Sequence, residues 1–292
     1  MLETEGWSDY ALLDTGAGRK LERYGPYRIV RPEAQALWTP RLDDAEWDAA
    51  DAHFVGISED ESDGRWRTRK PLGETWELDY DGMAFLGRFT SFRHVGVFPE
   101  QITHWRWLEG IIRNAGRPLK VLNLFGYTGL ASLIAARAGA EVTHIDASKK
   151  AIGWARENQQ IAGLESLPIR WICDDAKKFV EREQRRGNHY DGIILDPPKF
   201  GRGPKGEVWD LFPDLPAMMR LCRTLLSDQP QFLILTAYSI RASFLAIDEL
   251  AAESLDGLGG VLESGELVLR EEGGGRALST SLFSRWSRHD KT

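Results

Sequence analysis

From about residue 118 onward, short apolar runs alternate with segments that have helical spacing. Residues 119–125 form an apolar run of strand type, and residues 129–138 are small and apolar at helical spacing. Further strands are predicted at 141–146, 169–173, 190–195 and 231–238, with helices at 149–162, 176–186, 215–226 and 242–254. Alternation of this kind is typical of a parallel sheet with helices on both faces.

The end of the chain departs from this alternation. Residues 265–271 and 278–286 are strand-like, and the glycine-rich segment 272–276 joins them. So short a connection predicts an antiparallel hairpin at the sheet edge. We therefore predict a doubly wound, seven-stranded, Rossmann-like α/β sheet with a C-terminal antiparallel hairpin.

The first hundred residues have a different pattern. They are rich in Trp, Tyr and Phe, with strand-like pieces at 27–31, 76–80 and 84–98 separated by turn-forming residues. We predict an acidic arm plus a small β-rich substrate domain at residues 1–98. The doubly wound domain then occupies residues 99–292.

The composition is that of a globular protein, with 42% hydrophobic and 28% charged residues among 292. The apolar runs are too short for a membrane-spanning helix, and the acidic N-terminus does not resemble a secretory leader. Cys173 and Cys222 suit neither a disulfide framework nor a zinc site, and the six histidines lack ligand spacing. We expect a cytoplasmic protein without a metal or a membrane partner; monomer and homodimer both stay open.

Charge is unevenly distributed along the chain. Residues 1–64 carry 6 Lys and Arg against 15 Asp and Glu, a net of −9, whereas residues 65–120 carry 10 against 6, a net of +4. The remaining residues carry 21 against 23, which brings the total to −7. The basic middle stretch is either a polyanion-binding surface or an ordinary solvated one.

In doubly wound sheets the ligand lies at the carboxyl ends of the strands, so the residues there are the candidate site. The first strand is followed by the glycine turn 125–129, which either brings backbone N–H groups close to a ligand or only makes a tight connection. Asp146 ends the second strand, where a carboxylate accepts hydrogen bonds from the hydroxyls of an adenosine ribose. The alternative is that Asp146 caps the next helix.

The third and fourth strands add further candidates. Asp174 and Asp175 follow the third strand; one can accept from an adenine amino group while the other caps the helix, and we favour Asp175 for the base. The fourth strand ends in Asp-Pro-Pro-Lys-Phe at 196–200, where two prolines fix an exposed turn. Phe200 in this turn is suited to stack on a planar acceptor.

Taken together, the segment Val-Leu-Asn-Leu-Phe-Gly-Tyr-Thr-Gly at 121–129, Asp146, the Asp174-Asp175 pair and the 196–200 motif resemble the class I S-adenosylmethionine-dependent methyltransferases. More narrowly, they are similar to the bacterial 23S ribosomal RNA methyltransferases that make 5-methylcytosine and 7-methylguanine. The resemblance covers roughly residues 85–290. It implies S-adenosylmethionine as cofactor and RNA, ribosomal RNA above all, as substrate.

The resemblance also implies which residues form the site. The turn at 125–129 borders the methionine part of the cofactor, Asp146 the ribose and Asp175 the adenine. The candidate cofactor-binding residues are Phe125, Gly126, Tyr127, Thr128, Gly129, Asp146, Ala147, Asp174, Asp175 and Asp196. The candidate catalytic residues are Asp196, Pro197, Pro198, Lys199 and Phe200, between cofactor and acceptor; Lys199 either orients the acceptor or is a simple surface lysine.

One departure from the resemblance concerns the chemistry. The 5-methylcytosine enzymes carry a nucleophilic cysteine just after the fifth strand, because carbon-5 of cytosine is activated by covalent addition at carbon-6. Here the stretch 235–241 has no cysteine, and Ser239 stands near the expected position. Cys173 and Cys222 are expected to be packing residues. We therefore predict direct transfer to a nitrogen or oxygen without a cysteine nucleophile.

Other functions remain possible at this stage. The acidic net charge favours a methyltransferase for a protein or small molecule, and the basic stretch 65–120 opposes it. More distant alternatives are a nicotinamide-dependent oxidoreductase and a non-catalytic, cofactor-binding RNA assembly factor. The oxidoreductase would require a third glycine in the turn and would not account for the 196–200 motif.

Overall fold

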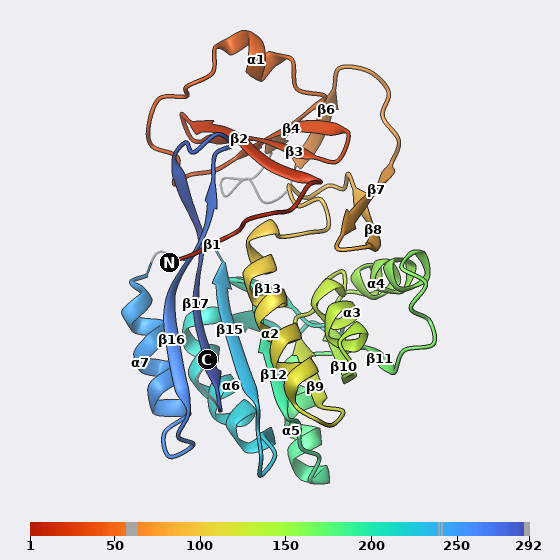
Figure 1. Cartoon of the computed structure of the whole chain (residues 1–292), viewed down its shortest axis with the longest axis vertical. Helices are drawn as coiled ribbons and strands as arrows, with labels where there is room; N and C mark the ends of the chain where they lie inside the picture. Colours follow the sequence, from red (N-terminus) through yellow and green to blue (C-terminus); the bar gives the residue numbers. More distant parts are fainter. Residues whose placement is uncertain (57–63, 239, 241, 289–292) are drawn as a thin grey trace. The chain divides into compact units, whose positions relative to one another are not determined.

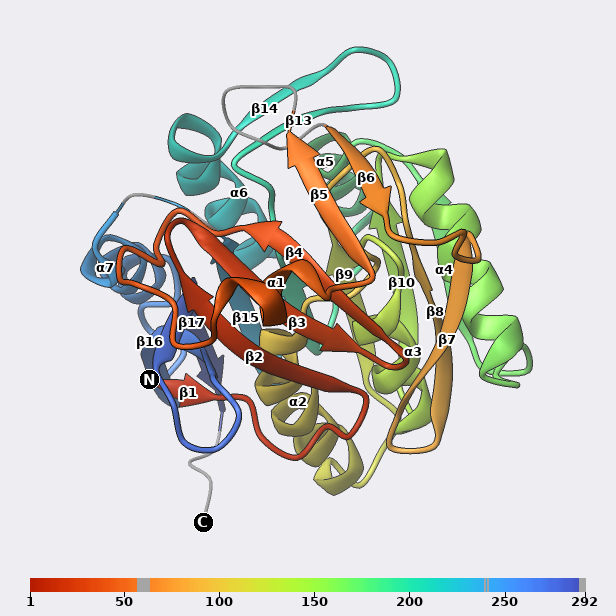
Figure 2. The same cartoon turned by 90° about the horizontal axis from the view of Figure 1, so that it is seen from above.

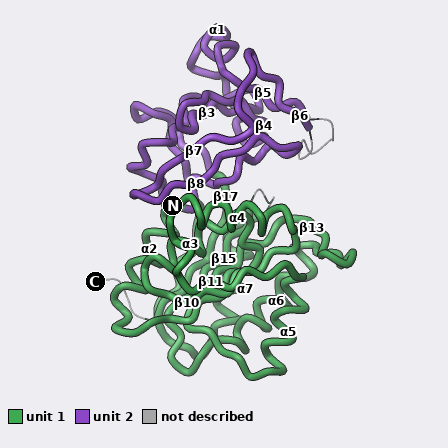
Figure 3. The backbone as a smooth tube through the Cα atoms, turned by 90° about the vertical axis from the view of Figure 1, so that its right-hand side faces the viewer, with its two compact units in different colours: residues 1–2, 102–267, 280–292 green, residues 3–101, 268–279 purple. Residues whose placement is uncertain are grey.

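The computed structural model describes residues 1–56, 64–238, 240 and 242–288. The chain forms two compact units, coloured separately in Figure 3. Unit 1 comprises residues 1–2, 102–267 and 280–292, and unit 2 comprises residues 3–101 and 268–279. Unit 2 is therefore made of two segments that are far apart in the sequence. The predicted domain boundary is a single one, between residues 98 and 99, and it stays a prediction.

Unit 1 is built on the predicted doubly wound sheet (Figure 1). The strands of this sheet are β1 (Leu2–Glu3), β9 (Lys120–Leu124), β10 (Glu141–Asp146), β11 (Ile169–Cys173), β12 (Gly192–Leu195), β15 (Phe232–Tyr238), β16 (Val261–Arg270) and β17 (Ala277–Ser287). Glu3 and the ends of β16 and β17 next to their turn, residues 268–270 and 277–279, are part of unit 2. The spatial order is β1-β16-β17-β15-β12-β9-β10-β11. The central pairs are parallel and β17 runs antiparallel to β15, so the seven predicted strands and the C-terminal hairpin are confirmed. The short edge strand β1 was not predicted.

Helices link the parallel strands, as crossover connections require. The linking helices are α3 (Leu130–Arg137), α4 (Lys149–Ile161), α5 (Ala176–Arg186), α6 (Leu211–Leu225) and α7 (Phe244–Ser254). A 3₁₀ turn at Pro99–Gln101 and helix α2 (Ile102–Asn114) come before the first of these strands, β9. Local signals set their ends: Ser148 caps α4 by accepting from the Ala151 amide, and Gly187 ends α5 in a left-handed conformation.

Two predicted elements have different bounds in the structure. The helix expected at 215–226 begins earlier, at Leu211. Pro213 is compatible with this because it lies in the first turn, where a missing N–H costs nothing, and the helix continues through Pro216. The strand expected at 84–98 ends at Arg88, whose amide donates to the Val95 carbonyl at 3.0 Å as the chain turns back.

Unit 2 is rich in strands. A five-stranded sheet contains β2 (Tyr10–Gly16), β3 (Arg19–Tyr24), β4 (Tyr27–Pro32), β5 (Ala52–Gly56) and β6 (Gly64–Thr68), in that order. A separate antiparallel pair is formed by β7 (Thr75–Tyr80) and β8 (Met83–Arg88), and the helix α1 spans Asp44–Asp48. On one face of the sheet, Trp47 of α1 packs with Leu21 and Val30.

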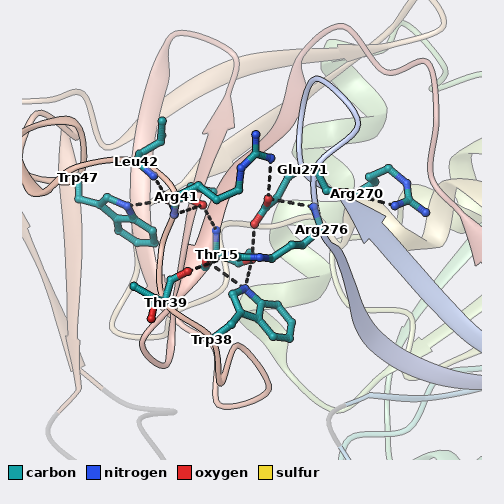
Figure 4. Close-up of polar contacts among 11 residues, drawn as sticks. Thr15, Trp38, Thr39, Arg41, Leu42, Trp47, Arg270, Glu271 and Arg276 are labelled. Carbon is teal, nitrogen blue, oxygen red and sulfur yellow. Dashed lines mark hydrogen bonds and ion pairs between the residues drawn. The ribbon is translucent and has the colours of Figure 1, made fainter.

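The turn between β16 and β17 belongs to unit 2, and one buried carboxylate, that of Glu271, is a centre of its contacts there (Figure 4). It accepts a hydrogen bond from the Thr15 hydroxyl at 2.5 Å and one from the Arg276 amide at 2.9 Å, and Arg41 lies 3.4 Å away. The Arg276 guanidinium donates to the Thr39 carbonyl at 2.6 Å. A glycine-rich turn from the end of the chain is thereby fastened to strand β2.

Replacing Glu271 by Ala should lower the free energy of unfolding by about 1–3 kcal/mol, because buried donors lose their acceptor. The urea midpoint checks this. The neighbouring Glu272→Ala, which removes an exposed carboxylate, is the matched control and should leave the midpoint unchanged. Equal midpoints for the two variants would contradict the role given to Glu271.

Candidate functional site

The register of the sheet brings the predicted strand ends together. Leu124 of β9 is paired with Ile145 of β10 and with Leu195 of β12. The residues that follow these three positions are Phe125, Asp146 and Asp196. All three therefore lie at one edge of the sheet, at the carboxyl ends of adjacent parallel strands, where doubly wound folds bind their ligands.

The turn after β9 has an unusual backbone. Phe125 and Tyr127 have φ values of 58° and 51°, in the left-handed region that non-glycine residues seldom adopt, and Gly129 has 83°. The Tyr127 amide donates to Asp146 Oδ2 at 2.9 Å, which fastens the turn to β10. Such backbone strain gathers at ligand sites, where the surrounding structure compensates for it.

The two glycines of this turn meet a packing requirement. A Cβ atom at Gly126 would overlap the ring of His144, and one at Gly129 would lie 2.8 Å from the ring of Trp171. At both positions the Cβ atom would come closer to the ring than real contacts allow, so any side chain there would push the turn away from the sheet. The tight-connection interpretation of the glycines therefore has direct structural support.

Beneath the turn lies a buried polar group of three residues. Asn123 Nδ2 donates to the Ser132 hydroxyl at 2.9 Å, and that hydroxyl lies 3.0 Å from His144 Nδ1. Burial lowers the pKa of His144 to about 3, so the ring is neutral at neutral pH. A neutral imidazole under the turn provides packing and hydrogen bonding without adding charge.

Asp146 is the central carboxylate of this edge. Besides the Tyr127 amide on Oδ2, it accepts from the Ser148 amide on Oδ1 at 2.8 Å. Burial raises the pKa of Asp146, and these two backbone hydrogen bonds oppose that rise. A carboxylate has about four lone-pair positions, so after two backbone contacts it can still accept two further donors. Next to it, the Ala147 carbonyl lies 3.5 Å from the Cys173 sulfur.

The two aspartates after β11 have different tasks. Asp175 Oδ1 caps α5 by accepting from the Lys178 amide at 2.9 Å. Its Oδ2 accepts no hydrogen bond within the part of the chain that the structure describes. Asp174 accepts from the Asp175 amide at 2.9 Å and pairs with Arg182. Asp174 is therefore committed to a cation, and Asp175 keeps one oxygen for another donor.

The turn after β12 is partly exposed. Pro197 is buried and Asp196 half-buried, whereas Phe200 is 61% exposed. The Lys199 carbonyl accepts from the Leu211 amide at 2.9 Å, and its ammonium lies 5.1 Å from the centre of the Phe200 ring. The turn is thus fixed at its backbone and presents an exposed aromatic side chain with a cation over it.

The glycine-rich, basic segment that follows this turn, residues 201–206, is partly ordered as a strand. Part of it is strand β13 (Phe200–Arg202), which pairs antiparallel with β14 (Val208–Asp210). We call these two strands and their connection, residues 200–210, the ribbon. Its backbone is hydrogen-bonded, with the Gly203 amide donating to the Glu207 carbonyl at 2.8 Å.

The ribbon contributes a residue that sequence reasoning missed, Trp209. Its indole N–H donates to the Pro198 carbonyl at 2.7 Å, and its ring centre lies 4.9 Å from that of Phe125. One buried side chain thus touches both the turn after β9 and the turn after β12. The Val-Trp pair at 208–209 resembles a short strand and could have signalled this position.

Burial disfavours the thiolate form of both cysteines. Cys222 is buried in α6, and burial raises its pKa to about 12; burial also raises the pKa of Cys173. Ser239 lies outside the described residues.

Within the ranges that the structure covers, no group of three His, Cys, Asp or Glu side chains is arranged to hold a metal ion. No helix in those ranges is both long and apolar enough to cross a membrane.

The geometry can now be compared with known proteins. The family model of the S-adenosylmethionine-dependent methyltransferases matches residues 43–255. A crystal structure of such a methyltransferase from Agrobacterium tumefaciens is 63% identical and superposes with a TM-score of 0.95, covering 98% of this chain and 93% of that one.

Two curated relatives are more distant. Ribosomal RNA large subunit methyltransferase K/L of Syntrophotalea carbinolica is 30% identical over 186 residues, which are 63% of this chain and 25% of the relative. Ribosomal RNA large subunit methyltransferase I of Aeromonas salmonicida is 39% identical over 82 residues, 28% of this chain and 21% of the relative. The matched segments span about a quarter of these relatives. By its fold and by the family model that covers most of its length, the chain belongs to the S-adenosylmethionine-dependent methyltransferases and uses S-adenosylmethionine as its cofactor.

Proposed function

We propose that the protein methylates RNA of the large ribosomal subunit, at a nitrogen or oxygen and without a cysteine nucleophile. The substrate is proposed from one observation, the similarity to two kinds of relative that are both named as large-subunit ribosomal RNA methyltransferases. A ribosomal substrate also implies a cytoplasmic protein.

The side chains at the sheet edge fit the proposed cofactor. Asp146 has acceptor positions left for the two ribose hydroxyls, and Asp175 Oδ2 is available to the adenine amino group. The strained turn that begins at Phe125 borders the methionine part. When bound, the cofactor supplies a methyl group on a positively charged sulfur.

The turn after β12 supplies the acceptor side of the proposed mechanism. An acceptor nitrogen or oxygen must be aligned with the methyl group and must lose a proton, and positioning contributes most of such catalysis. Asp196 is a half-buried carboxylate at the shared edge and is the group to which we assign the proton. The high pKa of Cys222 and the raised pKa of Cys173 support transfer without a thiolate.

Charge favours a second candidate, a protein or small-molecule substrate. Unit 2 carries 14 Lys and Arg against 22 Asp and Glu, a net of −8, and unit 1 carries 23 against 22, a net of +1. A net negative unit repels a polyanion over the Debye length, about 8 Å at physiological salt. This opposes RNA binding by unit 2 but leaves unit 1 open to it.

The substrate is tested by transfer of labelled methyl groups to fractions of a strain that lacks the gene. Ribosomal RNA, ribosomal subunits, transfer RNA, protein and small molecules are assayed separately. We expect label in large-subunit ribosomal RNA with the wild-type protein and at least a hundredfold less with Asp196→Ala, because positioned proton transfer contributes about 10²–10⁴-fold. Label confined to the protein or small-molecule fraction would replace this proposal by the second candidate.

If Asp146 accepts hydrogen bonds from the ribose, the affinity for the cofactor should depend on pH. Because burial raises its pKa, this carboxyl becomes protonated at a higher pH than an ordinary aspartate and then loses acceptor positions. Affinity for S-adenosylhomocysteine should therefore be full above the raised pKa and fall as the pH drops through it. Calorimetric titration between about pH 4 and pH 7 measures this. Asp146→Ala should bind S-adenosylhomocysteine about 10- to 100-fold more weakly at neutral pH. If the affinity of this variant fell with pH in the same way as that of the wild-type protein, the assignment of Asp146 to the ribose would be wrong.

Trp209→Phe keeps a ring near Phe125 but removes the hydrogen bond to the Pro198 carbonyl. Because the turn after β12 is then less well positioned, kcat should fall about 10- to 100-fold while KM for S-adenosylmethionine stays within about twofold. Trp209→Leu also removes the ring contact with Phe125 and should raise KM as well.

The matched control is Trp66→Phe. The indole of Trp66 donates to the Phe92 carbonyl at 3.2 Å within unit 2, so the same kind of bond is lost between two residues that do not belong to the candidate site. Steady-state kinetics should leave this variant at wild-type values. If both Trp→Phe variants lost kcat equally, Trp209 would have no special positioning role.

A further inference from the structure

The ribbon has two different faces. Its register pairs Gly201 with Trp209 and Arg202 with Val208. Because side chains alternate along a strand, Gly201 and Trp209 share one face and Phe200, Arg202 and Val208 share the other. Trp209 is 6% exposed, whereas Val208 is 72% exposed and Arg202 is also exposed. We call the second face, together with Lys199 and Lys205, the outer surface of the ribbon.

The ribbon is held at two points. Trp209 fastens its inner face to the Pro198 carbonyl, and Glu207 near its tip forms an ion pair of 2.5 Å with Lys178 of α5. The hydrogen bond from Lys178 lowers the pKa of Glu207 to about 2, so this carboxylate stays ionised and paired. The backbone of the ribbon is therefore fixed at both points, and the ribbon lies beside α6 (Figure 2).

The outer surface carries cations that the protein itself does not neutralise. Lys199, Arg202 and Lys205 are all exposed. Among the described residues, neither Arg202 nor Lys205 forms an ion pair. One half-buried carboxylate, that of Asp210, lies on the same face opposite Phe200. With Glu207 paired to Lys178, the surface keeps an excess of positive charge.

Exposed apolar side chains stand among these cations. Phe200 is 61% exposed, and the Lys199 ammonium lies 5.1 Å from its ring centre. An aromatic platform flanked by cations is the arrangement that binds single-stranded nucleic acid, whose bases stack while its phosphates pair with Lys and Arg. The net charge of unit 1, +1 against −8 for unit 2, favours this surface over unit 2 for a polyanion.

We propose that the outer surface of the ribbon binds an unpaired segment of the RNA substrate, with Arg202 and Lys205 on its phosphates and Phe200 against a base. This inference rests on the proposed function and deepens it. It assigns substrate docking to residues 199–208 of unit 1 and not to the N-terminal β-rich region, for which sequence reasoning predicted that role.

The test compares two double variants of the full-length protein. Arg202→Ala/Lys205→Ala removes the two cations of the ribbon. Arg185→Ala/Arg220→Ala removes two exposed cations of α5 and α6 and is the matched control for net charge. The probe is an in vitro transcript of large-subunit ribosomal RNA, whose affinity is measured by filter binding at a series of salt concentrations.

We expect the ribbon variant to bind about tenfold more weakly. The slope of log affinity against log salt should be shallower by about 1.4, since each phosphate contact on a single strand contributes about 0.7. The control variant should keep the wild-type slope. Val208→Glu, which adds a carboxylate to the outer surface, should also weaken binding. Affinity for S-adenosylhomocysteine, measured on the same samples, should stay unchanged and shows that each variant is folded.

Two different results would contradict the proposal. If the wild-type protein binds and methylates the transcript and the ribbon variant matches it in affinity and slope, the ribbon does not bind RNA, although the proposed function stands. If the wild-type protein binds S-adenosylhomocysteine but neither binds nor methylates the RNA, both the ribbon proposal and the RNA substrate are wrong.

Discussion

The hydrogen bond between the Asp146 carboxylate and the Tyr127 amide is the contact on which the candidate site depends most. It joins the end of β10 to the strained turn after β9 and holds Tyr127 in a left-handed conformation. The second oxygen of the same carboxylate accepts from the Ser148 amide just before α4. One side chain therefore fixes two neighbouring strand ends while it still has acceptor capacity for a ligand.

A second link extends this arrangement to the acceptor side. Trp209 contacts Phe125 with its ring and the Pro198 carbonyl with its N–H, so the turns after β9 and β12 share a buried partner. The ribbon that carries Trp209 is itself anchored through Glu207 to Lys178. The inner face of the ribbon thus supports the site, and its outer surface remains exposed, which is why we assign substrate docking to it.

The sheet and most of the edge residues could be predicted because they depend on local patterns. Alternation of apolar strands and helices predicts the succession of elements along the chain in unit 1. The carboxyl ends of the strands in a parallel sheet then meet at one edge. Ser148 as a cap is likewise a local signal. Contacts between distant residues were beyond such reasoning. Thr15 and Glu271 are 256 positions apart, and the segment 272–276 was predicted only as a hairpin connection. Trp209 was missed because its only local signal is the Val-Trp pair at 208–209, in a strand of three residues that is too short to show alternation.

The most direct test is a crystal structure of the protein with S-adenosylhomocysteine bound. We expect the ribose hydroxyls within hydrogen-bond distance of Asp146, the adenine amino group at Asp175 Oδ2, and the sulfur between Phe125 and Asp196. A ligand bound elsewhere, or one whose ribose leaves Asp146 without a contact beyond its two backbone amides, would contradict this expectation.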